Sequence, residues 1–193
     1  MSEEEVAEIK ASLRANAMAR RNAIAADFRD DAAVLAAEVF MAKIAPRQGL
    51  TISAYWPIGS EIDTRPLLVR LMDLGCAVAL PETQGDEPLI MRLWEKDAPL
   101  YPSGFGTLAP IETAPVVEPD LVVLPLLGFD RQGNRLGYGK GHYDRTIAAM
   151  SRKPTLIGLA FAGQEIDQIP HGAHDIPLDG VVTEAGLRVF ERP

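Results

Sequence analysis

The sequence predicts a three-layer α/β/α domain built on a mainly parallel β-sheet. Short apolar, strand-like segments alternate along the chain with segments of helical periodicity. Residues 121–124 (LVVL) form a continuous apolar run, which is typical of a strand buried on both faces of a parallel sheet. The 193 residues contain no internal repeat and no Gly/Ser linker. We therefore expect a single domain over 1–193.

The first two expected elements are helices. A helix over 3–21 is indicated by one stripe of apolar side chains, which are Val6, Ile9, Leu13 and Ala17. An alanine-rich segment at about 27–45 predicts a second helix, closed by Pro46 and Gly49.

Strands and two shorter helices follow. A strand is expected over 50–55, and then a helix over about 65–74 with Thr64 as its N-cap and Gly75 as its C-terminal stop. The Pro- and Gly-rich residues 97–119 predict a long surface loop. A last helix is expected at about 141–151. Further strands are expected over the apolar segments 76–80, 89–94, 121–124, 155–161, 181–183 and 187–190.

Composition excludes several classes of protein. A net charge of −8 and a pI near 4.9 argue against a nucleic-acid or anionic-membrane surface. The apolar runs are too short to span a membrane, and the acidic start MSEEEVAEIK is unlike a secretory signal. The lone Cys76, in an apolar context, predicts a buried residue and a reducing compartment. We expect a cytoplasmic protein, monomeric, that acts on small molecules.

Residues 120–145 are the segment richest in chemistry. Five glycines accompany four cations, which are Arg131, Arg135, Lys140 and Arg145. Within it, loop 125–141 leaves the carboxyl end of the 121–124 strand, and ligands bind at such strand ends in parallel sheets. It predicts an anion site, because glycine lets backbone N–H groups approach oxyanions. A tight surface turn with solvated charges is the alternative. The segment fits neither G-x-x-x-x-G-K-[ST] nor G-x-G-x-x-G.

Taken whole, the segment resembles the signature of the 5-formyltetrahydrofolate cyclo-ligase family. The resembling residues are Leu124-Pro125, Gly128-Phe129-Asp130, Gly133-x-Arg135-Leu136-Gly137-Tyr138-Gly139-x-Gly141 and Tyr143-Asp144-Arg145. Three further blocks also resemble the family in the right order. They are Lys10-x-x-x-Arg14, Tyr55-Trp56-Pro57 with Glu61-Ile62-Asp63-Thr64, and His174-Asp175 with Leu178-Asp179-Gly180-Val181-Val182-Thr183-Glu184.

This resemblance implies the fold of sugar-phosphate isomerases and CoA transferases. It also implies conversion of 5-formyltetrahydrofolate to 5,10-methenyltetrahydrofolate, with MgATP consumed to ADP and phosphate. ATP would phosphorylate the formyl oxygen, and N10 of the folate would then attack the activated carbon. Two rivals remain open: an isomerase-like or CoA-transferase-like enzyme on the same fold, and a non-catalytic homologue that binds nucleotide or folate.

By resemblance, the N-terminal basic pair and the glycine segment bind ATP. The implied ATP-binding residues are Lys10, Arg14, Arg135, Leu136, Gly137, Tyr138, Gly139, Lys140, Gly141, His142 and Tyr143. Arg135, Lys140 and Tyr143 are the implied catalytic residues. A helix that begins near Gly141 would add its positive N-terminal end. Without the resemblance, a solvated helix face is the favoured interpretation of Lys10 and Arg14.

The remaining implied contacts are with folate and magnesium. The folate contacts are Tyr55, Glu61, Phe105 and Tyr138, with Trp56 as a further aromatic candidate. Asp144 and Asp179 are the implied Mg²⁺ ligands. From the residues alone, Asp144 could cap a helix, Asp179 could be a turn residue, Glu61 could lie on the surface and the aromatics could be core.

The chain departs from the family pattern at three positions. His142 stands where the family usually has tyrosine, Lys140 where many members have glycine, and Ala109 where a polar or acidic residue is common. His171 and His174 are interpreted as loop histidines, and Arg131 and Arg145 as residues that pair locally or shape the loop.

Overall fold

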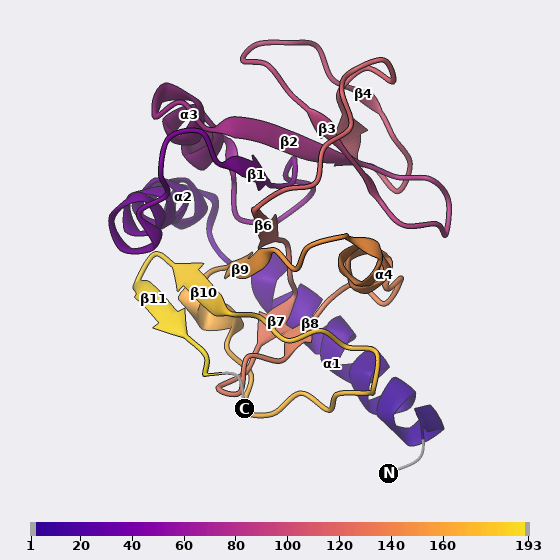
Figure 1. The fold of residues 1–193 in the computed structure, drawn as a ribbon. Helices are drawn as coiled ribbons and strands as arrows, with labels where there is room; N and C mark the ends of the chain where they lie inside the picture. Colours follow the sequence, from indigo (N-terminus) through magenta and orange to yellow (C-terminus); the bar gives the residue numbers. More distant parts are fainter. Residues whose placement is uncertain (1–2, 192–193) are drawn as a thin grey trace.

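The computed structural model describes residues 3–191. Within this range, a seven-stranded sheet is covered by helices on both faces (Figure 1). The strand order is β11-β10-β9-β6-β1-β2-β3. The strands are β1 (Thr51–Ser53), β2 (Ala77–Glu82), β3 (Ile90–Leu93), β6 (Leu121–Leu124), β9 (Thr155–Leu159), β10 (Gly180–Thr183) and β11 (Gly186–Val189). The central strands run parallel, and β3 and β11 pair antiparallel at the two edges. The predicted three-layer, mainly parallel architecture is confirmed.

In the described part of the chain, four α-helices flank this sheet. They are α1 (Glu3–Asn22), α2 (Ala26–Val39), α3 (Arg65–Asp73) and α4 (His142–Ala149), with a π-helical turn η1 (Phe40–Ile44) after α2 and a 3₁₀ turn η2 (Ala162–Gln164) after β9. All four lie where the sequence predicts helices. None of the described helices combines the length and apolar character that a membrane span requires.

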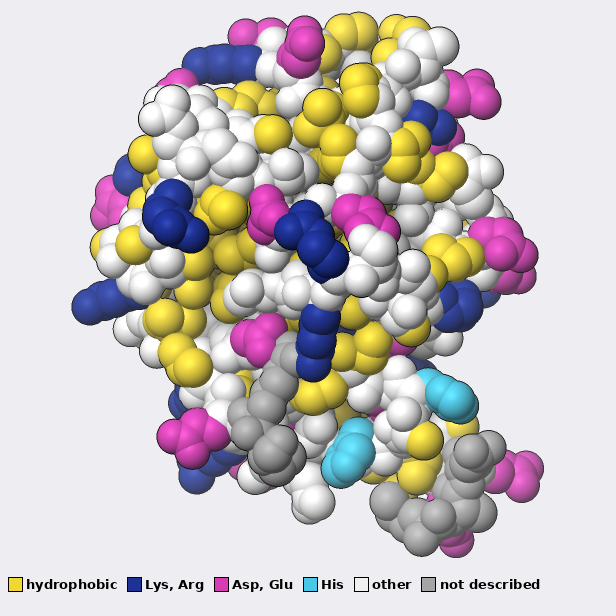
Figure 2. All heavy atoms as spheres, in the orientation of Figure 1, with side chains coloured by type: hydrophobic (Ala, Val, Ile, Leu, Met, Phe, Trp, Pro, Cys, Tyr) yellow, Lys and Arg dark blue, Asp and Glu magenta, His cyan; other side chains and the backbone are white. Residues whose placement is uncertain are grey.

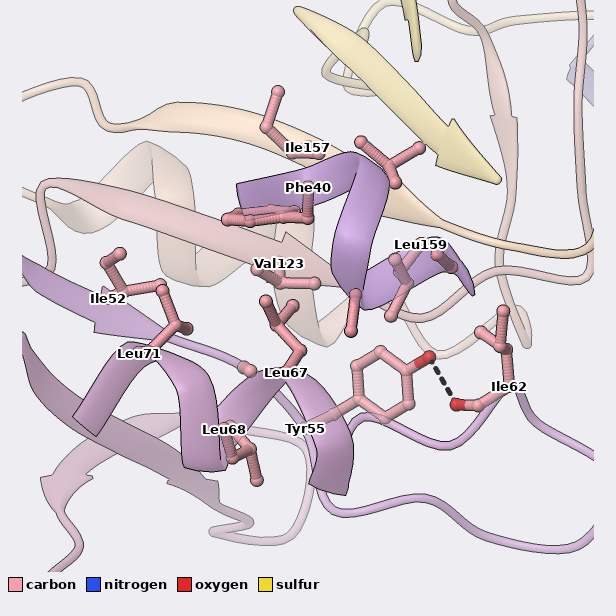
Figure 3. Close-up of a cluster of buried hydrophobic side chains, with 14 of the residues drawn as sticks. Phe40, Ile52, Tyr55, Ile62, Leu67, Leu68, Leu71, Val123, Ile157 and Leu159 are labelled. Atoms are coloured by element: carbon pink, nitrogen blue, oxygen red, sulfur yellow. Dashed lines mark hydrogen bonds between the residues drawn. The ribbon is translucent and has the colours of Figure 1, made fainter. Parts of the chain in front are cut away.

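The sheet is buried on both faces because successive strand residues point to opposite sides. On β6, Val123 contributes to the apolar cluster under α2 and α3, whereas Val122 and Leu124 contribute to the cluster under α4. Figure 3 shows Val123 with Phe40 of η1 and Leu67 of α3 in the first cluster. The continuous apolar run that predicted this strand therefore serves two separate cores.

The first helix packs beside the segment that leaves β6. Leu13, Ala17 and Met18 of α1 contact a small apolar cluster that includes Leu127 and Leu136. Arg14, next to Leu13 on this helix, reaches the glycine-rich segment and donates to the Gly137 carbonyl. The basic residues of α1 can therefore approach that segment from outside the sheet.

Two hairpins were not predicted. Tyr101–Pro102 (β4) pairs with Leu108–Ala109 (β5) inside the expected loop, and Gly128–Phe129 (β7) pairs with Arg135–Leu136 (β8) inside the glycine-rich segment. Strands of two residues are too short for alternation of apolar and polar residues to show in a sequence.

The capping prediction for Thr64 is half right. Thr64 occupies the N-cap position of α3, but its side chain makes no cap hydrogen bond. Its Oγ1 donates instead to the carbonyl of Tyr55 at 2.6 Å, and Asp63 Oδ1 accepts from the Arg65 N–H at 2.8 Å. Thr64 thus holds the Tyr55 backbone in place, and the neighbouring aspartate satisfies the helix terminus.

Asp130 organises the β7–β8 hairpin. Its side chain is fully buried and accepts hydrogen bonds from Gln132 N, Asn134 N, Asn134 Nδ2 and Ile169 N, at 2.9 to 3.0 Å. Asp130→Ala is expected to lower the free energy of unfolding by about 3 kcal/mol or more, because several buried donors lose a charged acceptor. Urea unfolding would measure this loss, with Asp130→Asn as a control that keeps one acceptor oxygen. A loss below about 1 kcal/mol would contradict this role.

Candidate active site

A cavity of about 450 Å³ opens at the carboxyl ends of β1, β2 and β6. It collects fifteen of the sixteen predicted contact residues; the exception is Asp179. The predicted residues that line it are Lys10, Arg14, Tyr55, Glu61, Phe105, Arg135, Leu136, Gly137, Tyr138, Gly139, Lys140, Gly141, His142, Tyr143 and Asp144. Trp56 and Asp175 also line it. Residues from both ends of the chain therefore meet at the edge where ligands bind in parallel sheets.

Two ion pairs line the cavity, and we call their four residues the ion-pair cluster. Arg135 Nη2 lies 2.6 Å from Asp144 Oδ1, and Lys10 Nζ contacts Asp175 Oδ2. The Arg135 side chain is only 8% exposed. Its Nε has no hydrogen-bond partner, and no other buried side-chain nitrogen or oxygen in residues 3–191 lacks one. A buried guanidinium with an unused donor is suited to an oxyanion.

The glycine-rich loop lies against Arg135 of this cluster and against Arg14 of α1. Arg14 Nε donates to the Gly137 carbonyl at 3.0 Å, so α1 is tied to the loop. Gly139 and Gly141 adopt positive φ, at 92° and 65°. A Cβ at Gly139 would lie 3.1 Å from the Arg14 guanidinium carbon. Glycine is required there by both its backbone conformation and this close approach.

A second group, which we call the Glu61–tyrosine cluster, contains Glu61, Tyr55, Tyr138 and Tyr143. Tyr138 Oη donates to Glu61 Oε1 at 2.5 Å, and the Ile58 N–H donates to Oε2 at 2.9 Å. Burial raises the pKa of Glu61, and these two hydrogen bonds offset only part of that rise. The Tyr55 hydroxyl donates to the Ile62 carbonyl at 3.0 Å among the buried side chains of the first apolar cluster (Figure 3), and Tyr55 also lines the cavity. Burial also raises the pKa values of Tyr55, Tyr138 and Tyr143.

Phe105 stands beside the loop in a strained conformation. Its φ is 49°, and its side chain is 54% exposed. Its ring centroid lies 5.4 Å from that of His142 and 5.4 Å from Lys140 Nζ. His142, one of the departures from the family pattern, has its Nε2 2.8 Å from the Gly85 carbonyl oxygen. Backbone strain at an exposed aromatic is common where a side chain meets a ligand.

The cations of the cavity are local and do not belong to a basic surface. Figure 2 shows Lys and Arg interspersed with Asp and Glu over the face drawn. Arg131 pairs with Glu165 at 3.2 Å, and Arg145 Nη1 donates to the Lys140 carbonyl at 2.8 Å. Both arginines therefore pair locally or shape the loop, as predicted. His171 and His174 are exposed residues of the loop before β10, and Cys76 is buried.

Comparison with known proteins agrees with this geometry. The model of the 5-formyltetrahydrofolate cyclo-ligase family matches residues 6–184. The chain belongs to this family. The cyclo-ligase of Mycolicibacterium smegmatis is 35% identical over 144 residues, which cover 70% of the chain and 74% of the relative. The cyclo-ligase of Mus musculus is 31% identical over 189 residues, covering 91% and 93%.

A solved structure agrees as well. The 5,10-methenyltetrahydrofolate synthetase of Aquifex aeolicus superposes with a TM-score of 0.83 at 26% identity, covering 96% of this chain and 94% of that one. The relatives are enzymes, so this cyclo-ligase family member belongs to a family of enzymes.

Of the two acidic residues predicted as magnesium ligands in this cyclo-ligase family member, Asp144 lines the cavity and Asp179 lies away from it. Asp179 does not line the cavity; its Oδ2 accepts from the Leu156 N–H at 2.8 Å. Asp179 directly precedes β10, and Leu156 is near the start of the parallel strand β9, so both lie at the amino ends of the strands. The cavity is at the opposite edge. Asp175 reaches it instead, from the loop before β10.

Sequence reasoning gave Asp175 no role, although it stands in the His174-Asp175 pair that resembles the family. Burial alone would raise the pKa of Asp175, but the hydrogen bonds from Lys10 and from the Gly172 N–H outweigh it, and the pKa is lowered. Asp175 is therefore held as a carboxylate beside the cations. Within residues 3–191, no three His, Cys, Asp or Glu side chains are grouped to hold a metal ion. A magnesium site of one or two carboxylates plus phosphates is compatible with that finding.

The raised pKa of Glu61 predicts how stability changes with pH. Because the folded-state pKa lies above the ordinary value near 4.5, the folded protein binds more protons than the unfolded chain between these two values. The contribution of Glu61 to the free energy of unfolding is therefore lost as the pH rises through the raised pKa of this residue. Glutamine does not titrate, so the Tm of Glu61→Gln minus that of the unmodified protein is expected to increase with pH over this interval. A difference that stays constant or falls between about pH 4 and pH 8 would contradict the burial argument.

Proposed function

We propose that this protein converts 5-formyltetrahydrofolate to 5,10-methenyltetrahydrofolate, with ATP converted to ADP and phosphate. The observation that carries the proposal is the meeting of two groups in one cavity. The ion-pair cluster under the glycine-rich loop suits phosphoryl groups, and the Glu61–tyrosine cluster suits an aromatic heterocycle with N–H donors. Membership of the cyclo-ligase family supports the same substrates.

The first chemical step activates the formyl group. This amide-like group is a poor electrophile, and its oxygen is a poor leaving group. Attack of the formyl oxygen on the γ-phosphorus of ATP forms an O–P bond, breaks the bond to ADP and solves both problems. The protein has mainly to place the two substrates in line and neutralise charge on the phosphoryl oxygens. Arg135, Lys140 and Lys10 supply the cations.

The second step closes the ring. The N10 lone pair attacks the activated carbon, N10 loses its proton, and the C–O bond breaks to release phosphate. The remaining positive charge is shared between N5 and N10 of the methenyl product. Tyr143, a member of the Glu61–tyrosine cluster, lines the same cavity as Arg135 of the ion-pair cluster, so we expect its hydroxyl to lie near the reacting atoms. The raised pKa of Tyr143 keeps its hydroxyl protonated and able to donate a hydrogen bond.

We further propose that Asp144 and Asp175 hold Mg²⁺ with the ATP phosphates, in place of the predicted pair of Asp144 and Asp179. Both carboxylates line the cavity beside the unused Nε of Arg135. Bound magnesium would neutralise phosphate charge, and it needs few protein ligands because it retains water molecules. The ion pairs to Arg135 and Lys10 hold both carboxylates in position.

The experiment is incubation with 5-formyltetrahydrofolate and MgATP, monitored at the near-ultraviolet band of the methenyl product. Product is expected only with ATP, together with one equivalent of ADP. The controls omit ATP or replace it with an analogue that cannot be hydrolysed at the γ-phosphate. Absence of product with MgATP, or equal product without ATP, would reject the proposal and leave the isomerase-like enzyme or the non-catalytic homologue.

A further inference from the structure

Arg21, near the C-terminal end of α1, is a buried cation outside the predicted site. Arg21 as a whole is only 2% exposed to solvent. Its Nε donates to Ser60 Oγ at 3.0 Å, and its Nη1 donates to Tyr138 Oη at 2.9 Å and to the Leu126 carbonyl at 3.4 Å. These partners are neutral. Burying a charge among neutral partners is costly, so the position of Arg21 needs an explanation beyond packing.

The hydrogen-bond chemistry of arginine fixes the direction of a relay. Arginine only donates, so the Tyr138 hydroxyl oxygen must accept from Arg21. The single hydroxyl proton of Tyr138 is then directed to Glu61 Oε1, 2.5 Å away. Arg21 also lies 5.7 Å from the centroid of the Tyr138 ring. The guanidinium thereby fixes both the ring and the hydroxyl of Tyr138.

The same logic fixes the loop that carries Glu61. Ser60 Oγ accepts from Arg21 and donates to Asn22 Oδ1 at 2.5 Å. The residue before Glu61 is therefore anchored to the end of α1. Glu61 Oε2 accepts from the Ile58 N–H, so each carboxylate oxygen receives one hydrogen bond from the protein. A carboxylate can accept about four hydrogen bonds, which leaves acceptor capacity facing the cavity.

We infer that Arg21 is a positioning residue for substrate recognition, acting through Tyr138 and Ser60 to hold Glu61 as a hydrogen-bond acceptor for the N–H donors of the substrate heterocycle. This inference rests on the proposed function, in which Glu61 contacts the folate. This role explains why a positive charge is buried at this position, which hydrogen bonds to neutral partners alone do not. The positive charge of Arg21 also favours the ionised form of Glu61, against the effect of burial.

Arg20 provides a matched control on the same helix. Its Nη2 donates to the Gly163 carbonyl at 2.9 Å, at an exposed position away from the relay. The variants to compare are Arg21→Met, Arg20→Met, Tyr138→Phe and the Arg21→Met/Tyr138→Phe double variant. Arg21→Met is expected to raise the KM for 5-formyltetrahydrofolate about tenfold, the factor expected when one hydrogen bond to a charged group is weakened. The KM for ATP is expected to change much less, because Arg21 does not line the cavity and the relay from it ends on Glu61.

A relay makes two further predictions that a merely structural role does not. The effect of Arg21→Met on KM should largely vanish in the Tyr138→Phe background, because the intermediate group is already missing. In ligand-free protein, ¹³C NMR of the Glu61 carboxyl should show a higher pKa in Arg21→Met than in Arg20→Met. The other titratable groups facing Glu61 are Tyr55, Tyr138 and Tyr143, whose raised pKa values keep them neutral in this range.

The outcomes separate this inference from the proposed function. An unchanged pKa of Glu61 in folded Arg21→Met, or additive effects in the double variant, would overturn the relay. Absence of turnover in the unmodified protein, with the pKa shift still present, would overturn the proposed function and leave the relay standing. If Arg21→Met does not fold, Tyr138→Phe tests the relay alone. It leaves the guanidinium in place, and an unchanged pKa of Glu61 there would again overturn the inference.

Discussion

Arg135→Met is expected to lower kcat by about 10³-fold, the upper part of the range for removing one charged donor from a transition state. Arg135 combines a buried guanidinium, an ion pair to Asp144 and an Nε without a partner. We expect the phosphoryl group to take up that unused donor as negative charge is redistributed during transfer. Steady-state kinetics at saturating ATP and folate would measure the loss.

Arg135→Lys is the control for charge alone. Lysine keeps the positive charge but presents one compact ammonium group in place of the planar fork of the guanidinium. Its activity is expected to fall between that of the methionine variant and the unmodified protein. A methionine variant within about tenfold of normal kcat would remove Arg135 from the transition state. Circular dichroism would first establish that the variant is folded, since Asp144 loses its partner.

Asp144→Asn is expected to reduce turnover at least about 10²-fold, with a larger loss at limiting magnesium. The change removes negative charge from the proposed metal site and weakens the ion pair with Arg135. The Ile176 N–H also donates to Asp144 Oδ1, at 3.0 Å, and asparagine can still accept that bond through its amide oxygen. Rates measured over a magnesium titration would separate weaker metal binding from the loss of the ion pair.

Asp179→Asn and Asp175→Asn complete the test. Asp179 lies outside the cavity, so its variant is expected to keep near-normal turnover at all magnesium concentrations. Asp175 lines the cavity, so its variant should resemble Asp144→Asn in its demand for magnesium. Near-normal turnover of Asp144→Asn at limiting magnesium, or a magnesium defect in Asp179→Asn alone, would contradict the proposed pair of ligands.

The layers of the fold could be predicted because burial leaves a pattern in the sequence. The apolar run Leu121–Leu124 and the amphipathic helices report directly which surfaces are covered. The hairpin β7–β8 left no such pattern. It depends on four hydrogen bonds to the single side chain of Asp130, and a buried aspartate in a turn looks the same in a sequence as an exposed one.

The candidate site was predictable where its residues are adjacent in the chain. Residues Arg135 to Asp144 form one contiguous loop and helix start, and all of them line the cavity. Which of Asp175 and Asp179 lines the cavity was not predictable from spacing. It depends on which edge of the sheet each residue occupies, and that follows from strand direction. Arg21 gave no signal either, because its neighbour Arg20 is also an arginine and only the structure shows which one is buried.

The fate of the formyl oxygen tests the central claim most directly. 5-Formyltetrahydrofolate labelled with ¹⁸O in the formyl group would be converted with unlabelled MgATP, and the released phosphate would be examined by ³¹P NMR. Phosphorylation of the formyl oxygen predicts one ¹⁸O atom in each phosphate released. Methenyl product formed alongside unlabelled phosphate would contradict that mechanism, because the oxygen would then have left the substrate without bonding to phosphorus.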